Sequence, residues 1–213
     1  EIRLSLVGSE MCIRDSAGKA VARESSLALL PRSLTALQAG AVPATALTAW
    51  QALTEHAGVQ PGQKVLIHAA AGGVGSMAVQ IAKYLGAEVI ASASADNHAY
   101  LKGLGADQVI DYRRQDFTQW RPAVDVVLDL VGEQTQALSF ALLKRHGVLV
   151  SPVSQPDITL ANDYGVTPVN FATRGDGGQL ARIAELFDQG RLQVAVQALS
   201  LIHISEPTRL RRI

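Results

Sequence analysis

Three glycines, Gly72, Gly73 and Gly75, stand between a continuous apolar run, Val65–Ala69, and a pattern typical of a buried helix. Backbone N–H groups approach an anion closely only where no Cβ atom intervenes, and glycine has none. The start of a helix also offers unpaired N–H groups and the positive end of the helix dipole. This arrangement predicts a site for the pyrophosphate of a dinucleotide, with Gly75 allowing the helix to pack closely on the strand.

The turn matches the dinucleotide fingerprint G-x-G-x-x-G in two of its three glycine positions, because Ala70 stands in the first. Its context strengthens the match: a strand pattern precedes it, and a helical pattern ending at Gly86 follows. A glycine-rich turn that binds no ligand is the alternative. A P-loop of the nucleotide-hydrolysing type is not indicated, since no Lys-Ser or Lys-Thr follows Gly75.

The end of the next predicted strand, Ala87–Ala93, indicates which dinucleotide would bind. NAD sites place Asp or Glu about 20 residues beyond the glycine turn, to accept hydrogen bonds from the ribose. Here that position falls in the neutral stretch Ala91–Ser94. A carboxylate would repel a 2′-phosphate, so its absence favours NADP over NAD. We expect Ser94, Asn97 and Tyr112 to donate hydrogen bonds to that phosphate; a helix N-cap role for Ser94 and Asn97 is equally compatible.

Charged residues near this position give opposite indications for a 2′-phosphate. Asp96 carries the wrong charge for a phosphate. Arg113 and Arg114 carry the right one, and would contribute only if the fold brings them near.

Short apolar strands alternate with helical patterns along the chain, which predicts an α/β fold with a doubly wound parallel sheet of the Rossmann type. We expect strands at Val65–Ala69, Ala87–Ala93, Gln108–Asp111, Val124–Leu130 and Gly147–Val150, and a strand-like segment at Gly18–Leu30. We expect helices at Ser33–Ala41, Ala44–Glu55, Asn97–Leu104, Gln134–Lys144 and Gln179–Gln189, besides the one after the glycine turn.

The two ends of the chain differ from what lies between them. Leu6–Ser16 and Leu199–Arg209 lack the periodicity, capping residues and composition of the rest. Codons can be chosen for Glu1–Ser16 so that the reverse complement of that DNA, read in one frame, encodes Leu199–Ile213. The shared DNA resembles a transposon-type adapter used in preparing sequencing libraries. We interpret the chain as an open reading frame from a short, metagenomic-type library fragment with residues 17–198 as its insert, and exclude the ends from the fold prediction.

Removing the ends changes the composition. The only cysteine, Cys12, lies in an end, so residues 17–198 offer neither a disulfide nor a thiolate zinc site. Five of the nineteen basic and four of the nineteen acidic residues also lie there, which leaves fourteen against fifteen. This balance does not favour nucleic acid or an anionic membrane as a partner.

Since no apolar run approaches the roughly 18 residues that span a bilayer, we expect a soluble, cytoplasmic protein. The remaining histidines show no metal-ligand spacing and are expected to be ordinary core or surface residues.

Five segments, in order and with matching spacing, resemble the medium-chain dehydrogenase/reductase superfamily, and specifically its zinc-independent quinone oxidoreductase branch. They are Ala44–Leu53, Pro61–Ser92, Leu104–Arg113, Asp125–Gly132 and Leu142–Ser151. The resemblance implies an NADP cofactor and direct hydride transfer from the nicotinamide to a quinone, enone or related α,β-unsaturated carbonyl compound. It implies no metal, and no catalytic residue is assigned.

The resemblance also implies roles for particular positions. Thr48 would lie beside the nicotinamide. The other cofactor-binding positions are Gly72, Gly73, Val74 and Gly75 in the pyrophosphate loop, Ser94, Asn97 and Tyr112 around the 2′-phosphate, and Val131 and Gly132 near the adenosine. His146 replaces the glycine of a tight turn.

The resemblance further predicts how the chain is divided. Residues 17–43 would be the remnant of an N-terminal catalytic β-domain and its connector, and residues 44–198 the dinucleotide-binding Rossmann domain, flanked by adapter-derived tails at 1–16 and 199–213. The substrate-selecting residues would then lie outside this chain, and the lobe would be inactive alone.

Other functions remain open. A zinc-type alcohol dehydrogenase or an enoyl-reductase module of the same superfamily would have a similar lobe, and a non-catalytic dinucleotide sensor is the alternative of another class. Members of the resembled family pair through an edge strand, for which Val166–Ala172 is the candidate here. An ordinary exposed loop is the other interpretation of that segment.

Overall fold

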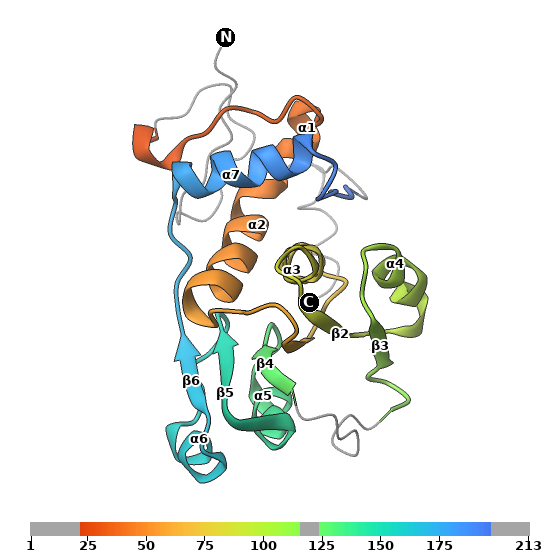
Figure 1. Cartoon of the computed structure of the whole chain (residues 1–213), viewed down its shortest axis with the longest axis vertical. Coiled ribbons are helices and arrows are strands. Elements are labelled where there is room, and N and C mark those ends of the chain that lie inside the picture. The colour runs from red at the N-terminus through yellow and green to blue at the C-terminus, as the bar shows by residue number, and fades with distance from the viewer. Residues whose placement is uncertain (1–21, 116–123, 197–213) are drawn as a thin grey trace, which may run out of the picture.

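A computed structural model describes residues 22–115 and 124–196, so both predicted tails lie outside the described residues. Within these ranges, six strands form one sheet in the order β3-β2-β1-β4-β5-β6, and every neighbouring pair is parallel (Figure 1). The strands are β1 (Lys64–Ile67), β2 (Glu88–Ala93), β3 (Gln108–Asp111), β4 (Val124–Leu128), β5 (Leu143–Ser151) and β6 (Thr167–Asn170). The chain builds outward from β1 in one direction, then returns to build outward in the other. This confirms the predicted doubly wound parallel sheet.

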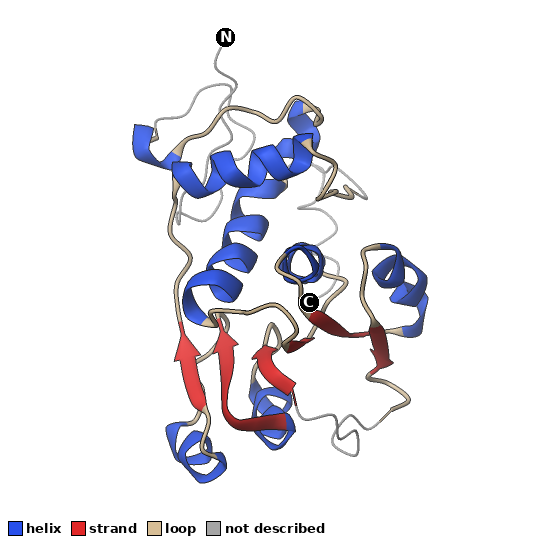
Figure 2. Cartoon of the chain, viewed as in Figure 1, coloured by secondary structure: helices blue, strands red, loops and turns tan. Residues whose placement is uncertain are grey.

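Helices cover both faces of the sheet (Figure 2). They are α1 (Ala36–Gly40), α2 (Val42–Gln51), α3 (Gly73–Tyr84), α4 (His98–Gly103), α5 (Glu133–Ser139), α6 (Ile158–Tyr164) and α7 (Gly177–Asp188). The buried apolar side chains of α2, α3, α4 and α7 join one core cluster. Those of the 3₁₀ turn Phe140–Leu142, which follows α5, and of α6 join a second. Along β1, Val65 and Ile67 belong to the first cluster and Leu66 to the second. Such a strand is apolar on both faces, which explains its unbroken hydrophobic run.

Helix α3 lies close against the end of β1, as its glycines predict. A Cβ atom on Gly75 would stand 2.5 Å from the carbonyl oxygen of Ala69 and 2.6 Å from Cα of Ala70. The helix ends near Gly86, whose φ of 83° suits a residue without a side chain. Gly75 is therefore required for packing, whatever ligand the turn binds.

The two expected helices before β1 are present. Thr35 and Gln38 form a reciprocal capping box at the start of α1, which accounts for a helix beginning there. Helix α2 has Pro43 in its first turn and continues into a π-helical turn, Ala52–His56.

Among the described residues, one expected strand is absent and two expected element boundaries are wrong. In the described part of Gly18–Leu30, the chain forms a 3₁₀ turn at Glu24–Ser26 and no strand. Its backbone lies against the start of α7, where a Cβ on Gly177 would collide with the carbonyl of Leu27. Helix α5 ends at Ser139, not at Lys144, and strand β5 begins earlier than Gly147.

The early part of β5 is irregular, which hides it in the sequence. Its first half is largely exposed, and its pairing with β4 shifts register between Val124 and Val126. His146 adopts φ 67°, the left-handed conformation that glycine accepts most readily. Exposed polar residues in a strand resemble the outer face of a helix, so periodicity alone placed this segment wrongly.

Strand β6 occupies one edge of the described sheet, within the segment Val166–Ala172 that was the candidate edge strand. Helix α6, which leads into it, begins at an N-cap, Asp157, and ends at Gly165 in the left-handed region. Among the described helices, none combines the length and apolar character needed to cross a bilayer.

Candidate dinucleotide-binding site

The turn between β1 and α3 presents backbone donors at the carboxyl end of the sheet. The N–H of Gly72 bonds to the carbonyl oxygen of Ala69 at 3.0 Å, and Ser76 makes a bond back to Gly72 at 2.8 Å. The N–H groups of Gly73, Val74 and Gly75 lie in the first turn of the helix. No preceding helical turn exists there to supply carbonyl groups that would accept their hydrogen bonds. These groups fit an anion such as a pyrophosphate, which the positive end of the helix dipole also favours.

A first pocket of about 430 Å³ opens between this turn, α2 and the segments that follow β5 and β6. Thr48 on α2 contributes a hydroxyl, which bonds to the Ala44 carbonyl and to the Thr173 hydroxyl, each at 2.7 Å. The rest of the lining is mainly apolar or backbone. It consists of Ala69, Gly72, Gly73, Val74, Gly75, Leu130, Pro152, Val153, Phe171 and Ala172.

A second pocket of about 600 Å³ opens between the same turn, the end of β2 and the start of α5. It contains Ser94, Asn97 and Tyr112, and the Asn97 side-chain amide donates to the Ser94 hydroxyl at 3.0 Å. The remaining lining is His68, Ala69, Ala71, Gly72, Ser92, Ala93, Val131, Gln134, Thr135 and Leu138. None of these described lining residues is Asp, Glu, Lys or Arg. The two pockets meet at Ala69 and Gly72, which line both.

The structure thus groups nine of the ten predicted cofactor-binding residues around two adjoining pockets. Thr48, Gly73, Val74 and Gly75 line the first, Ser94, Asn97, Tyr112 and Val131 line the second, and Gly72 lines both. Gly132 is not among the lining residues. Its φ of 84° and its position as the N-cap of α5 give it a local backbone role.

A buried carboxylate, Asp129, holds the turn that contributes Val131 to the second pocket. Asp129 is fully buried just after β4. One of its oxygens accepts the N–H groups of Val131 and Gly132 at 3.0 and 2.9 Å. The other accepts from the Gln136 amide and the Ser151 hydroxyl at 2.9 and 3.1 Å. All four bonds hold protein groups together, so Asp129 fixes the turn that presents Val131.

His68 is a core histidine at the base of the second pocket. It is 1% exposed, and its Nε2 lies 2.9 Å from the Ser139 hydroxyl. Burial lowers the pKa of His68 from 6.5 to about 4, and the charge of Asp129 opposes this shift without overcoming it. The imidazole is therefore neutral at physiological pH.

Neither Arg113 nor Arg114 is among the described residues that line the second pocket. The guanidinium carbon of Arg113 lies 5.7 Å from the centre of the Tyr112 ring, within cation–π range. Arg114 pairs with Asp111 at 3.8 Å. Asp96 is exposed in the 3₁₀ turn before α4, outside the lining. Arg113 therefore contacts one residue of the pocket wall, its neighbour in the chain, Tyr112.

Sequence reasoning missed the far wall of the first pocket. Phe171, Ala172 and Thr173 follow β6 and come near α2 only through the tertiary fold. Ala69 was also missed as a strained position, with φ 48°. A strand end followed by small residues was the available signal for Ala69, whereas no local pattern marks residues 171–173.

The sheet order and the helices on both faces define a Rossmann-like α/β fold, and comparisons with known proteins identify its relatives. A family described as "Zinc-binding dehydrogenase" matches residues 104–205. Polyketide synthase GfsB of Streptomyces halstedii is 43% identical over 170 residues, covering 76% of this chain and 3% of that protein.

Within residues 22–115 and 124–196, no three His, Cys, Asp or Glu side chains gather as metal ligands would.

Solved structures extend the likeness over most of the chain. The quinone oxidoreductase of Coxiella burnetii has a TM-score of 0.77 at 35% identity, over 87% of this chain and 60% of that one. The CurK enoyl reductase has a TM-score of 0.76 at 30% identity, over 86% and 61%. The Escherichia coli quinone oxidoreductase complexed with NADPH has a TM-score of 0.72 at 30% identity, over 80% and 59%. The chain is thus similar to oxidoreductases of the medium-chain dehydrogenase/reductase superfamily, and spans about 60% of the length of these solved structures.

Proposed function

We propose that this chain is the cofactor-binding lobe of a zinc-independent, NADPH-dependent reductase that transfers hydride to a quinone, an enone or a related α,β-unsaturated carbonyl compound. The observation that carries the proposal is the meeting of two pockets at the glycine turn. Each pocket has a volume in the range of small-ligand sites. A dinucleotide has two halves joined by a pyrophosphate, and the turn supplies anion-binding donors at the junction.

The second pocket suits the adenosine half of the dinucleotide. Its described lining offers the side-chain donors Ser94, Asn97 and Tyr112, and no carboxylate that would repel a 2′-phosphate. The guanidinium stacked on Tyr112 adds a positive charge nearby. The bound NADPH named for the Escherichia coli relative supports the same choice of cofactor.

The first pocket suits the nicotinamide half. When bound there, a reduced nicotinamide would supply the hydride. The paired hydroxyls of Thr48 and Thr173 offer hydrogen-bonding groups to a carboxamide. Phe171 and Leu130 present apolar surface that excludes water from the reacting face. In this proposal, the residues that select the substrate lie outside the cofactor-binding lobe.

Titration of the chain with NADPH and with NADH, followed by nicotinamide fluorescence, tests the cofactor assignment. We expect saturable binding with NADPH preferred about tenfold or more, because the second pocket has donors for a 2′-phosphate and no opposing carboxylate. The matched pair Tyr112→Phe and Tyr100→Phe checks the site. Tyr112 lines the second pocket, whereas Tyr100 lies on α4 outside both lining sets.

Loss of the NADPH preference in Tyr112→Phe alone would support the assignment. A preference for NADH in the unmodified chain would contradict it, and would indicate Asp96 as the ribose partner. A folded chain that binds neither nucleotide would refute the cofactor-binding function of this lobe.

A second candidate is an enoyl-reductase module of a polyketide synthase. The 43% identity to a polyketide synthase and the likeness to the CurK enoyl reductase favour it specifically. Sequencing longer DNA clones that contain this gene distinguishes the two. A reading frame many times the length of this chain would indicate a synthase module, and one less than twice its length would indicate a separate reductase. Assays of the longer protein with a quinone and with an enoyl thioester would then test the substrate.

A further inference from the structure

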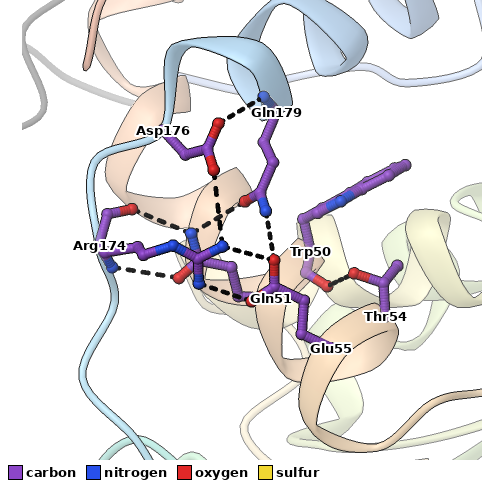
Figure 3. A network of polar contacts seen from close by, with 7 residues as sticks. All are labelled: Trp50, Gln51, Thr54, Glu55, Arg174, Asp176 and Gln179. Carbon is purple, nitrogen blue, oxygen red and sulfur yellow. Dashed lines mark hydrogen bonds and ion pairs between the residues drawn. The ribbon is translucent and has the colours of Figure 1, made fainter. Parts of the chain in front are cut away.

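A fully buried glutamine holds the far wall of the first pocket in place. The side-chain amide of Gln51 donates to the carbonyl of Arg174 at 2.9 Å, and its oxygen accepts the N–H of Arg174 at 3.1 Å (Figure 3). It also donates to the side-chain oxygen of Gln179 at 2.9 Å. Both backbone groups of one residue are thus fixed by a single side chain from α2.

Other contacts from α2 and the π-helical turn after it hold the residues around Arg174. Thr48 and Gln51 are three residues apart on α2, and Glu55 follows four residues later in the π-helical turn. Thr48 bonds Thr173, and Glu55 forms a two-point ion pair with Arg174, at 2.6 and 2.7 Å (Figure 3 shows the latter pair). The segment after β6 is therefore attached at successive points to α2 and to the π-helical turn that continues it.

That segment forms part of the first pocket and no part of the second. Phe171, Ala172 and Thr173 line the first pocket, immediately before the residue that Gln51 holds. The ring of Phe171 also packs on that of His56, with centres 4.3 Å apart. Gln51 itself lines neither pocket. A change at Gln51 would therefore act on the wall of the first pocket without removing a ligand contact.

We propose that Gln51 is a positioning residue, which sets the wall formed by residues 171–173 so that the first pocket fits the nicotinamide half of the dinucleotide. This inference rests on the proposed function, because it assigns the nicotinamide to that pocket. Its consequence is selective: loss of the Gln51 hydrogen bonds weakens binding of the whole dinucleotide, and leaves binding of its adenosine half unchanged.

The chain offers a matched control in Gln80 on α3. This glutamine is also buried, donates to the carbonyl of Gln193 at 3.0 Å and accepts the N–H of Gln193 at 2.8 Å. It also donates to the carbonyl of Ser76 at 3.0 Å. Two of these bonds match those that Gln51 makes to Arg174, but they hold Gln193, which lines neither pocket.

The test compares Gln51→Met with Gln80→Met in the full chain, since methionine keeps the volume of glutamine and removes its hydrogen bonds. The probes are NADPH and adenosine 2′,5′-bisphosphate, with NADH and ADP-ribose as a second pair that lacks the 2′-phosphate. In Gln51→Met we expect the Kd for NADPH and NADH to rise about tenfold, and the Kd for the two adenosine probes to change less than about twofold. Emission of bound NADPH should shift towards that of free NADPH. Gln80→Met should leave all four values unchanged.

Equal losses for whole and half ligands, unchanged NADPH binding in Gln51→Met, or the same loss in Gln80→Met would each overturn the inference. Should Gln51→Met fail to fold, Gln179→Ala replaces it under the same criteria, because it removes one bond to Gln51 and one to Glu55. Selective loss with NADH and no preference for NADPH would support the inference and contradict the choice of NADP. An unmodified chain that binds no probe would refute both proposals.

Discussion

Gly75 shows how a single missing side chain sets the distance between helix α3 and strand β1. We predict that Gly75→Ala destabilises the chain by about 2 kcal/mol or more, because the new Cβ would meet backbone atoms of Ala69 and Ala70, which cannot rotate away. The free energy of unfolding in urea measures this. Gly103→Ala is the control, since nothing lies within 4 Å of a Cβ placed there. Equal stability of the two variants would contradict the close packing.

His68 couples the stability of the fold to pH. Its folded-state pKa of about 4 lies below the ordinary value of 6.5, so in the range between them the unfolded state binds a proton that the folded state does not. The stabilisation is present above pH 6.5 and is lost as pH falls towards 4. The loss should reach about 3 kcal/mol.

The free energy of unfolding, measured in urea between pH 4 and 7, tests this behaviour. His68→Gln keeps a polar group facing the Ser139 hydroxyl and cannot titrate, so its stability should fall less steeply over that range. An identical slope in the variant and the unmodified chain would show that His68 is not the group responsible.

At the scale of elements, Asp129 joins the end of β4 to the start of α5 and the end of β5. We predict that Asp129→Asn destabilises the chain by about 2 kcal/mol, because the amide cannot accept from Gln136 and Ser151 while its oxygen serves the backbone of residues 131 and 132. Thermal unfolding measures the loss.

Asp157→Asn is the matched control for that substitution. Asp157 caps α6 with one oxygen, and asparagine caps a helix about as well. The control should therefore unfold close to the temperature of the unmodified chain. A similar, small effect of both substitutions would mean that the buried network around Asp129 tolerates an amide.

Elements were predictable where local sequence determines them. The run Val65–Ile67 is apolar on both faces because helices cover both sides of the sheet, and Gly75 and Gly86 mark positions where backbone geometry allows little else. The wall at Phe171–Thr173 could not be predicted, because its position depends on contacts with α2 more than a hundred residues earlier in the chain. The start of β5 was not predicted for a different reason, because the exposed residues there do not alternate with buried ones as in a regular strand.

At the scale of the whole molecule, β6 forms one edge of the sheet within the described residues. We propose that two copies pair through this strand, as the resemblance implies. Thr167 is exposed at the start of β6, so Thr167→Lys should convert a dimer to a monomer, because a charged edge residue opposes strand pairing. Sedimentation velocity checks this. A monomeric unmodified chain, or a variant that still sediments as a dimer, would contradict the proposal.

The strand order also has a consequence for how the chain is made. Strand β1 is paired with β2 on one side and β4 on the other, and β4 comes last of the three in the chain. While a ribosome is still translating residues 88–123, the apolar strand β1 can gain only its first neighbour, and its second edge stays open to pairing with other chains. Ribosome-bound chains stalled before Val124 should therefore be cleaved more readily at β1 by a protease than chains stalled well beyond Ser151. Strand β1 is thus open to pairing with other chains until β4 has been made.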